Sequence, residues 1–259
     1  MQIVACQLDI VWENKPANHD RVRQMLAGIA IEPGALVVLP EMFATGFSMD
    51  VAAIAEPIGG ETQQFLSALA KDLQSFVIGG VAIRGAGARG RNEAVVFGPE
   101  GNALARYCKL QPFSYAGETK HYEAGEGIEI FQWHDFDVAP FICYDLRFPE
   151  IFRQAVRSGA ELMIVIANWP QPRESHWLAL LRARAIENQA YVVGANRAGN
   201  DPHLGYSGHS LIVGPRGETL AEAGNGQQVL TADVNLESLL DYRQQFPALA
   251  DIRPDFFAE

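Results

Sequence analysis

Three polar side chains, each directly after an apolar stretch, carry the groups needed to attack an amide or nitrile carbon. Glu41 follows ALVVLP, Lys109 follows ALARYC, and Cys143 follows VAPFI. Active sites of α/β proteins usually form where buried strands end. A thiol becomes a strong nucleophile when it loses its proton. We therefore expect Cys143 to attack, Glu41 to take its proton, and Lys109 to stabilise the charge that develops on the substrate oxygen.

The residues after Cys143 predict the start of a helix. In YDLRFPE, Asp145 precedes the expected helix and Pro149 falls in its first turn, which is typical of a capped helix start. A thiol near a helix N-terminus has a lowered pKa, so this setting favours a reactive Cys143. The backbone N–H of Tyr144 is a candidate second donor to the substrate oxygen.

Each of these residues also has a structural interpretation. Cysteine is among the most buried residue types, and a single Glu41 or Lys109 is more often a solvated surface residue than a catalytic one. Cys6 and Cys108 lie within expected strands, and we interpret both as core thiols.

Composition and charge exclude several classes of protein. The chain has 259 residues, of which 48% are hydrophobic and 20% charged, as in a folded globular protein with a substantial core. Its net charge of −11 argues against binding to nucleic acid or to an anionic membrane. The N-terminus has no signal-peptide pattern, and no apolar run is long enough to span a membrane.

Cysteine and histidine usage argues against disulfides and metal sites. The three cysteines form no CxxC pair, and the histidines are scattered without the spacing of metal ligands. We therefore expect a cytoplasmic protein with reduced thiols and no metal.

Alternating patterns predict an α/β layered sandwich that forms one domain over residues 1–259. Three strand-like stretches separated by glycine-rich turns predict an antiparallel meander over 75–110, in which GARGRN (87–92) is a hairpin turn rather than a phosphate-binding loop. The other expected strands are 2–8, 34–40, 136–145, 161–169, 190–197 and several antiparallel ones within 206–235, and the expected helices are 18–30, 61–74, 147–159 and 174–189.

Together these motifs resemble those of the nitrilase, or carbon–nitrogen hydrolase, superfamily over nearly the whole chain. The matching stretches are LPEMFATGF with Glu41, YCKLQPF with Lys109 and ICYDLRFPE with Cys143. Many members have a further active-site glutamate, and Glu118 in GETKHYEAG matches its position. The resemblance implies a four-layer αββα sandwich that usually pairs into homodimers, and a Glu–Lys–Cys set that uses no metal or organic cofactor. Glu118 would orient the lysine or assist the second half-reaction.

The resemblance also implies a reaction and a substrate class. Ammonia would leave a thioester on the cysteine, which water then hydrolyses. The stretch NWPQPRESHWLALLRARAIENQAYVVGANRAG resembles the bacterial omega-amidase-like branch, whose members deamidate 2-oxoglutaramate and 2-oxosuccinamate. Family members often read Lys-x-His-Leu-Phe after the lysine, whereas Gln111 and Pro112 precede Phe113 here, so we expect a different pocket shape near Phe113.

A substrate with a far carboxylate needs a cation to bind it. Arg173, in the loop after NWPQP, is the candidate because arginine can bind a carboxylate through two parallel hydrogen bonds; the alternative is a salt-bridged or solvated loop arginine. Trp169 is a candidate wall of the same pocket or a core residue. We interpret Arg182, Arg184 and Glu187 as a structural charge network or part of a dimer face.

Three other functions stay open at this point. The same chemistry could act on an N-carbamoyl compound, a nitrile or a deaminated glutathione. A non-catalytic binding protein would be expected to have lost at least one of Glu41, Lys109 and Cys143. A thiol protease would need a histidine partner in a suitable context.

Overall fold

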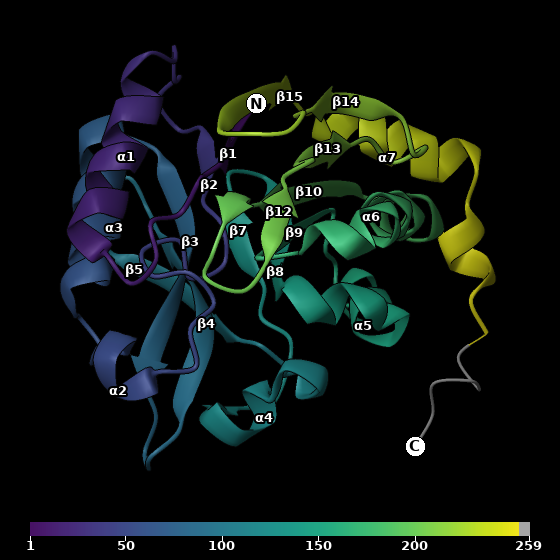
Figure 1. Ribbon diagram of the computed structural model, residues 1–259. Helices are drawn as coiled ribbons and strands as arrows, with labels where there is room; N and C mark the ends of the chain where they lie inside the picture. The colour runs from purple at the N-terminus through teal and green to yellow at the C-terminus, as the bar shows by residue number, and fades with distance from the viewer. Residues whose placement is uncertain (254–259) are drawn as a thin grey trace.

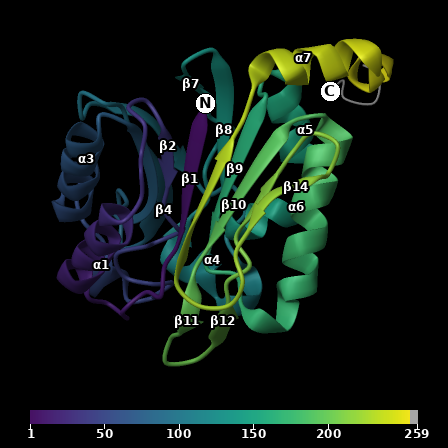
Figure 2. The ribbon, with the colours of Figure 1, turned by 90° about the horizontal axis from the view of Figure 1, so that it is seen from above.

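The computed structural model describes residues 1–253, and residues 254–259 of the expected domain lie outside the described residues. Two β-sheets pack face to face, and helices cover the outer face of each sheet (Figures 1 and 2). The predicted four-layer αββα sandwich is therefore confirmed.

The first sheet has seven strands in the order β15-β1-β2-β3-β4-β5, with β6 paired to β4. Strands β1, β2 and β3 are parallel, whereas β3, β4 and β5 form the predicted antiparallel meander. The turn between β3 and β4 is a hairpin, as expected for GARGRN. The bounds are β1 (Gln2–Gln7), β2 (Leu36–Val38), β3 (Phe76–Arg84), β4 (Gly90–Phe97), β5 (Ala103–Cys108), β6 (Tyr122–Glu123) and β15 (Gln228–Asp233).

The second sheet has six strands in the order β14-β13-β10-β9-β8-β7, of which β8, β9 and β10 are parallel. Its bounds are β7 (Phe131–Trp133), β8 (Phe136–Ile142), β9 (Leu162–Ala167), β10 (Tyr191–Asn196), β13 (Leu211–Val213) and β14 (Thr219–Glu222). A separate hairpin joins β11 (Ala198–Asn200) to β12 (Gly205–Ser207).

Two pairs of long helices form the outer layers. Helices α1 (Lys15–Ala27) and α3 (Glu61–Leu73) bury one apolar face each, including Val22 and Leu66, against the first sheet. Helices α5 (Pro149–Arg157) and α6 (Glu174–Asn188) cover the second sheet. The remaining helices are α2 (Val51–Ile54), α4 (Glu118–His121) and α7 (Leu236–Gln245).

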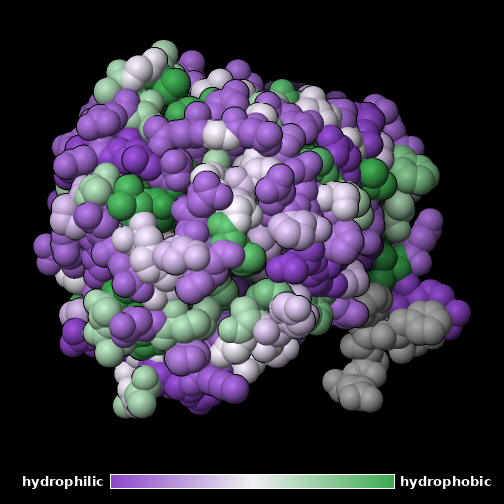
Figure 3. All heavy atoms as spheres, in the orientation of Figure 1, coloured by the Kyte–Doolittle hydropathy of each residue, from purple (hydrophilic) through white to green (hydrophobic). Residues whose placement is uncertain are grey.

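The surface in the view of Figure 3 is mostly hydrophilic, with apolar side chains in scattered small groups. No helix within residues 1–253 is both long and apolar enough to cross a membrane.

Candidate active site

The predicted catalytic side chains come together where strands of both sheets end. Glu41 follows β2 and Lys109 follows β5 in the first sheet, and Cys143 follows β8 in the second. Asn168, directly after β9, links the two sheets because its backbone N–H donates to Glu41 Oε2 at 2.8 Å. The candidate site therefore lies between the sheets, where these strands end.

Lys109 is fully buried and lies between two carboxylates. Its Nζ is 3.0 Å from Glu41 Oε1 and 2.9 Å from Glu118 Oε2. Burial alone would lower the pKa of Lys109, but the Glu118 and Glu41 carboxylates raise it well above the usual lysine value. Lys109 is therefore an ammonium ion held between the two carboxyl groups.

A close approach of two backbone segments positions Glu41. The N–H of Gly80 on β3 donates to the carbonyl of Pro40 at 3.1 Å. A Cβ at position 80 would collide with the backbone of Glu41 and Met42. Glycine is therefore required on β3 for Glu41 to lie beside it.

Glu118 is held by the first turn of α4. It begins that helix directly after Gly117, which has a φ of +80°, and its Oε2 accepts a hydrogen bond from the backbone N–H of Phe113. The loop that carries Phe113 is thus bonded to the carboxylate that faces Lys109.

Cys143 occupies a sharp turn between β8 and a short 3₁₀ helix, Cys143–Arg147. Its φ of +47° lies in the left-handed region, which is unfavourable for residues other than glycine. The side chain lines a cavity, and its Sγ lies 4.0 Å from the carbonyl oxygen of Asn168. The left-handed backbone at Cys143 thus directs its thiol toward the cavity between the sheets.

The predicted helix with Pro149 in its first turn is confirmed, but the lowered pKa of the thiol is wrong. Helix α5 begins at Pro149, and the 3₁₀ helix separates it from the thiol. Burial, followed by the charge of Glu41, raises the pKa of Cys143 well above its usual value, although the Lys109 ammonium opposes this. The thiol of Cys143 therefore holds its proton more tightly than a free thiol does.

Asp145 is a buried connector and does not cap α5, whose N-cap is Phe148. Its carboxylate accepts hydrogen bonds from the N–H of Ile142 at 2.9 Å, the N–H of Gln111 at 2.9 Å and the hydroxyl of Tyr107 at 2.8 Å. Burial raises the pKa of Asp145 to about 7, while these donors oppose the rise. Asp145 thus joins the turn that carries Cys143 to the segment that carries Lys109.

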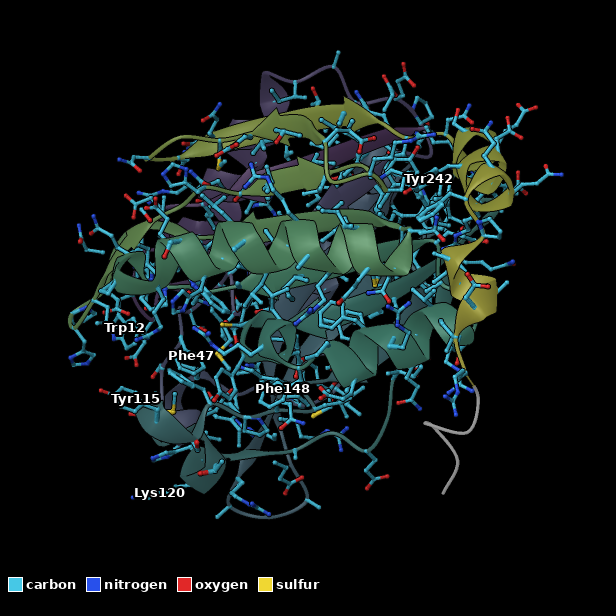
Figure 4. All side chains as sticks on the ribbon, turned by 90° about the vertical axis from the view of Figure 1, so that its right-hand side faces the viewer. Trp12, Phe47, Tyr115, Lys120, Phe148 and Tyr242 are labelled. Atoms are coloured by element: carbon cyan, nitrogen blue, oxygen red, sulfur yellow. The ribbon has the colours of Figure 1, made fainter. Side chains whose placement is uncertain are left out.

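A small cavity of about 60 Å³ opens at Cys143. The predicted residues Tyr144, Phe113, Trp169 and Arg173 all line it. Figure 4 shows another lining residue, Phe47, between α6 and the α4 region, at the end of the molecule opposite Tyr242. A larger hollow of about 500 Å³ lies beside α3 and contains none of the predicted catalytic residues, so we assign the chemistry to the smaller cavity.

Two arginines line this cavity next to each other. Arg147 stacks over the ring of Trp169 at 4.6 Å, and Arg173 lies 5.5 Å from the ring centre of Phe113. Burial and the neighbouring Arg173 cation lower the pKa of Arg147. Among residues 1–253, neither guanidinium has a carboxylate within salt-bridge distance, although the chain carries a net charge of −11. This pair makes the cavity attractive to an anion.

The other sequence interpretations concern residues outside the cavity. Cys6 and Cys108 are buried, as expected of core thiols, and burial raises their pKa values to about 12 and about 11. Arg184 pairs with Glu187 at 2.8 Å and donates to the carbonyl of Leu146. In the part of the chain that the structure describes, no group of His, Cys, Asp and Glu side chains is arranged to hold a metal ion.

Sequence reasoning missed three residues of the site. Arg147 lies four positions after Cys143, and Asn168 directly follows β9, which is the same end-of-strand signal that identified Glu41 and Lys109. Asn92 had no such signal because it lies within β4. Its side-chain Nδ2 donates to Glu41 Oε1 at 2.7 Å and to Glu118 Oε1 at 3.0 Å.

Comparison with known proteins identifies the class to which this fold and site belong. A family model for carbon–nitrogen hydrolases matches residues 2–244, and the chain belongs to that family.

Individual relatives cover nearly the whole chain. The omega-amidase YafV of Escherichia coli K12 is 37% identical, with 97% of this chain and 96% of that protein aligned. A 2-oxoglutaramate amidase of Bacillus subtilis is 32% identical, and the alignment covers 98% of each.

Solved structures share the fold as well as the sequence. A CN-hydrolase superfamily protein from Xanthomonas campestris, which has an arsenic adduct in its active site, has a TM-score of 0.91 at 32% identity and covers 98% of this chain and 97% of its own. An amidase from Nesterenkonia sp. AN1, solved with the acetamide moiety of fluoroacetamide attached to its active-site cysteine, has a TM-score of 0.86 at 26% identity, with coverages of 99% and 95%.

Proposed function

We propose that this protein hydrolyses the ω-amide of a small 2-oxo dicarboxylic acid, such as 2-oxoglutaramate or 2-oxosuccinamate, and releases ammonia. The observation that carries this proposal is the pair of arginines without carboxylate partners in the same cavity as Cys143. The names of the relatives from Escherichia coli and Bacillus subtilis support the same substrate class.

The first half-reaction acylates Cys143. Sγ attacks the amide carbon, and Glu41 takes the thiol proton as the S–C bond forms. Lys109 Nζ and the backbone N–H of Tyr144 stabilise the oxyanion. Glu41 then gives the proton to the amide nitrogen, the C–N bond breaks, and ammonia leaves a thioester.

The second half-reaction regenerates the enzyme. Glu41 takes a proton from water, the resulting hydroxide attacks the thioester carbon, and the C–S bond breaks as Cys143 recovers its proton. Glu118 holds Lys109 in position through both halves, which its 2.9 Å contact with Nζ supports. No metal or organic cofactor is part of this scheme.

The two arginines are proposed to bind the carboxylate of the substrate at the far end from the amide. Trp169 and Phe113 would hold the guanidinium groups of Arg147 and Arg173 by stacking.

Replacing Arg173 by alanine is therefore expected to raise KM for 2-oxoglutaramate by about 10- to 100-fold, because a charge-assisted hydrogen bond contributes about 1.5–3 kcal/mol. KM for a neutral amide of similar length should change little. Ammonia release from both amides measures this difference. Arg182→Ala is the matched control, because Arg182 lies on α6 and pairs with Glu222 at 3.4 Å, outside the cavity. Equal effects of Arg173→Ala on both amides would remove Arg173 from substrate recognition.

We further propose that the chain forms a homodimer in a reducing, cytoplasmic compartment. Exposed apolar side chains on α6, on α7 and directly after α7 support pairing of two copies; they are Ile186, Leu240 and Phe246. The three free thiols support a reducing compartment. Sedimentation of the purified protein as a monomer would contradict the dimer.

A further inference from the structure

The two oxygens of Glu41 have different surroundings. Oε1 accepts hydrogen bonds from Asn92 Nδ2 at 2.7 Å and from Lys109 Nζ at 3.0 Å. Oε2 accepts from the backbone N–H of Asn168 at 2.8 Å and, through a longer hydrogen bond, from the side-chain Nδ2 of Asn168 at 3.4 Å. The longest of these four hydrogen bonds ends on Oε2, and hydrogen bonds weaken with distance, so Oε2 is the oxygen whose lone pair is more easily freed to accept a proton.

The thiol of Cys143 and Oε2 of Glu41 share a neighbour, Asn168. Cys143 Sγ is 4.0 Å from the carbonyl oxygen of Asn168, the same residue whose N–H binds Oε2. We infer that Asn92 is a positioning residue that, together with Lys109, holds Glu41 by Oε1 so that Oε2 is the oxygen that takes the proton of Cys143. This inference rests on the proposed function, since it takes Glu41 as the base.

The proton then follows a defined route. The S–H bond of Cys143 breaks as the S–C bond forms, and the proton passes to Oε2 of Glu41. It leaves Oε2 for the amide nitrogen as the C–N bond breaks and ammonia departs. Asn92 exchanges no proton in this sequence; its amide stays hydrogen-bonded to Oε1 throughout.

Among the described residues, the side chain of Asn92 is hydrogen-bonded only to the two glutamates. It is fully buried, and its Oδ1 has no hydrogen-bond partner within residues 1–253, an arrangement that destabilises a fold. Pairing with the segment of Lys109 uses the backbone carbonyl of Asn92, which accepts from the N–H of Lys109 at 2.9 Å. The contacts that explain an amide at this position are those of Nδ2 with Glu41 and Glu118.

The choice of an amide also suits the charge of the site. Two carboxylates already lie within hydrogen-bond distance of the Lys109 ammonium. An aspartate at position 92 would add a third buried negative charge, and a lysine would compete with Lys109 for the same oxygens. Asparagine donates to both carboxylates without changing the net charge.

The experiment compares Asn92→Ala and Asn92→Leu with a matched control, Asn188→Ala. Asn188 is as fully buried as Asn92, its Oδ1 likewise lacks a partner among the described residues, and its Nδ2 donates to the carbonyl of Arg184 within α6. Steady-state ammonia release from 2-oxoglutaramate and the melting temperature are measured for each variant, with Cys143→Ala as the inactive reference.

Both Asn92 variants are expected to lose about 100-fold in kcat with KM changed less than about 3-fold, because misplacing a catalytic group slows chemistry without weakening binding. Their melting temperatures should be close to that of Asn188→Ala, which also removes a buried amide and should keep its kcat. Wild-type kcat in either Asn92 variant, or a kcat loss that the fraction of unfolded protein explains in both, would overturn the role of Asn92. If Cys143→Ala still turned over, the proposed function itself would fail.

Discussion

Replacing Cys143 by alanine is expected to reduce amide turnover on the order of 10⁴-fold or more, because removing the nucleophile of a catalytic set abolishes the covalent route. Substrate binding should change little, since the arginines and aromatic side chains that line the cavity stay in place. Ammonia release from 2-oxoglutaramate at saturating substrate measures the loss.

The controls for this variant are the other two cysteines of the chain. Cys6 lies in β1 and Cys108 in β5, both buried and free. Cys6→Ala and Cys108→Ala should keep turnover per folded molecule close to that of the wild type. Turnover that survives in Cys143→Ala, or disappears equally in all three variants, would contradict the assignment of Cys143.

Replacing Lys109 by methionine is expected to destabilise the protein by about 3–5 kcal/mol and to abolish turnover, because it leaves two buried carboxylates without their cation. Both Glu41 and Glu118 are fully buried and lie within 3.2 Å of Lys109 Nζ. Denaturant unfolding measures the free energy of unfolding, and ammonia release measures the turnover.

A second substitution separates the structural effect from the catalytic one. In Lys109→Met/Glu118→Gln one of the two unpaired charges is removed, so part of the lost stability should return while the activity stays absent. Lys15→Met is the control for loss of an ion pair elsewhere, since Lys15 pairs with Glu56 at 3.1 Å near α1 and α3, and its turnover should be unaffected. A double variant that regained activity along with stability would show that Lys109 has only a structural role.

The layers of the fold followed from local patterns in the sequence. Apolar strands alternate with amphipathic helices, and the face of α1 that carries Val22 and Leu26 packs on the first sheet as its spacing predicts. The glycine-rich turns of the meander likewise connect antiparallel strand pairs, as expected. These features depend on neighbouring residues, so a single sequence contains enough information to predict them.

Most of the site could be predicted because active-site residues of α/β proteins usually lie directly after buried strands. Glu41, Lys109 and Cys143 each follow a strand, and parallel strands deliver such residues to one edge of their sheet. Asn92 was not predicted as a site residue because it lies inside β4. Only the register between β4 and β5 places it opposite Lys109. Register between distant strands is not readable from the local pattern alone.

The thiol pKa could not be predicted from the residues next to Cys143. The pattern after it indicated a helix N-terminus, whose field would lower the pKa. In the folded chain, burial and the charge of Glu41, which lies about 100 positions earlier, outweigh any such effect and raise it. Contacts between residues far apart in sequence decided the outcome.

The mass of the protein during turnover tests whether a thioester forms on Cys143. Wild-type protein mixed with 2-oxoglutaramate and quenched rapidly in acid should gain the mass of the substrate less ammonia, and peptide mapping should place that acyl group on Cys143. An unmodified protein at every quench time during ammonia release, or an acyl group on any residue other than Cys143, would contradict the thioester mechanism.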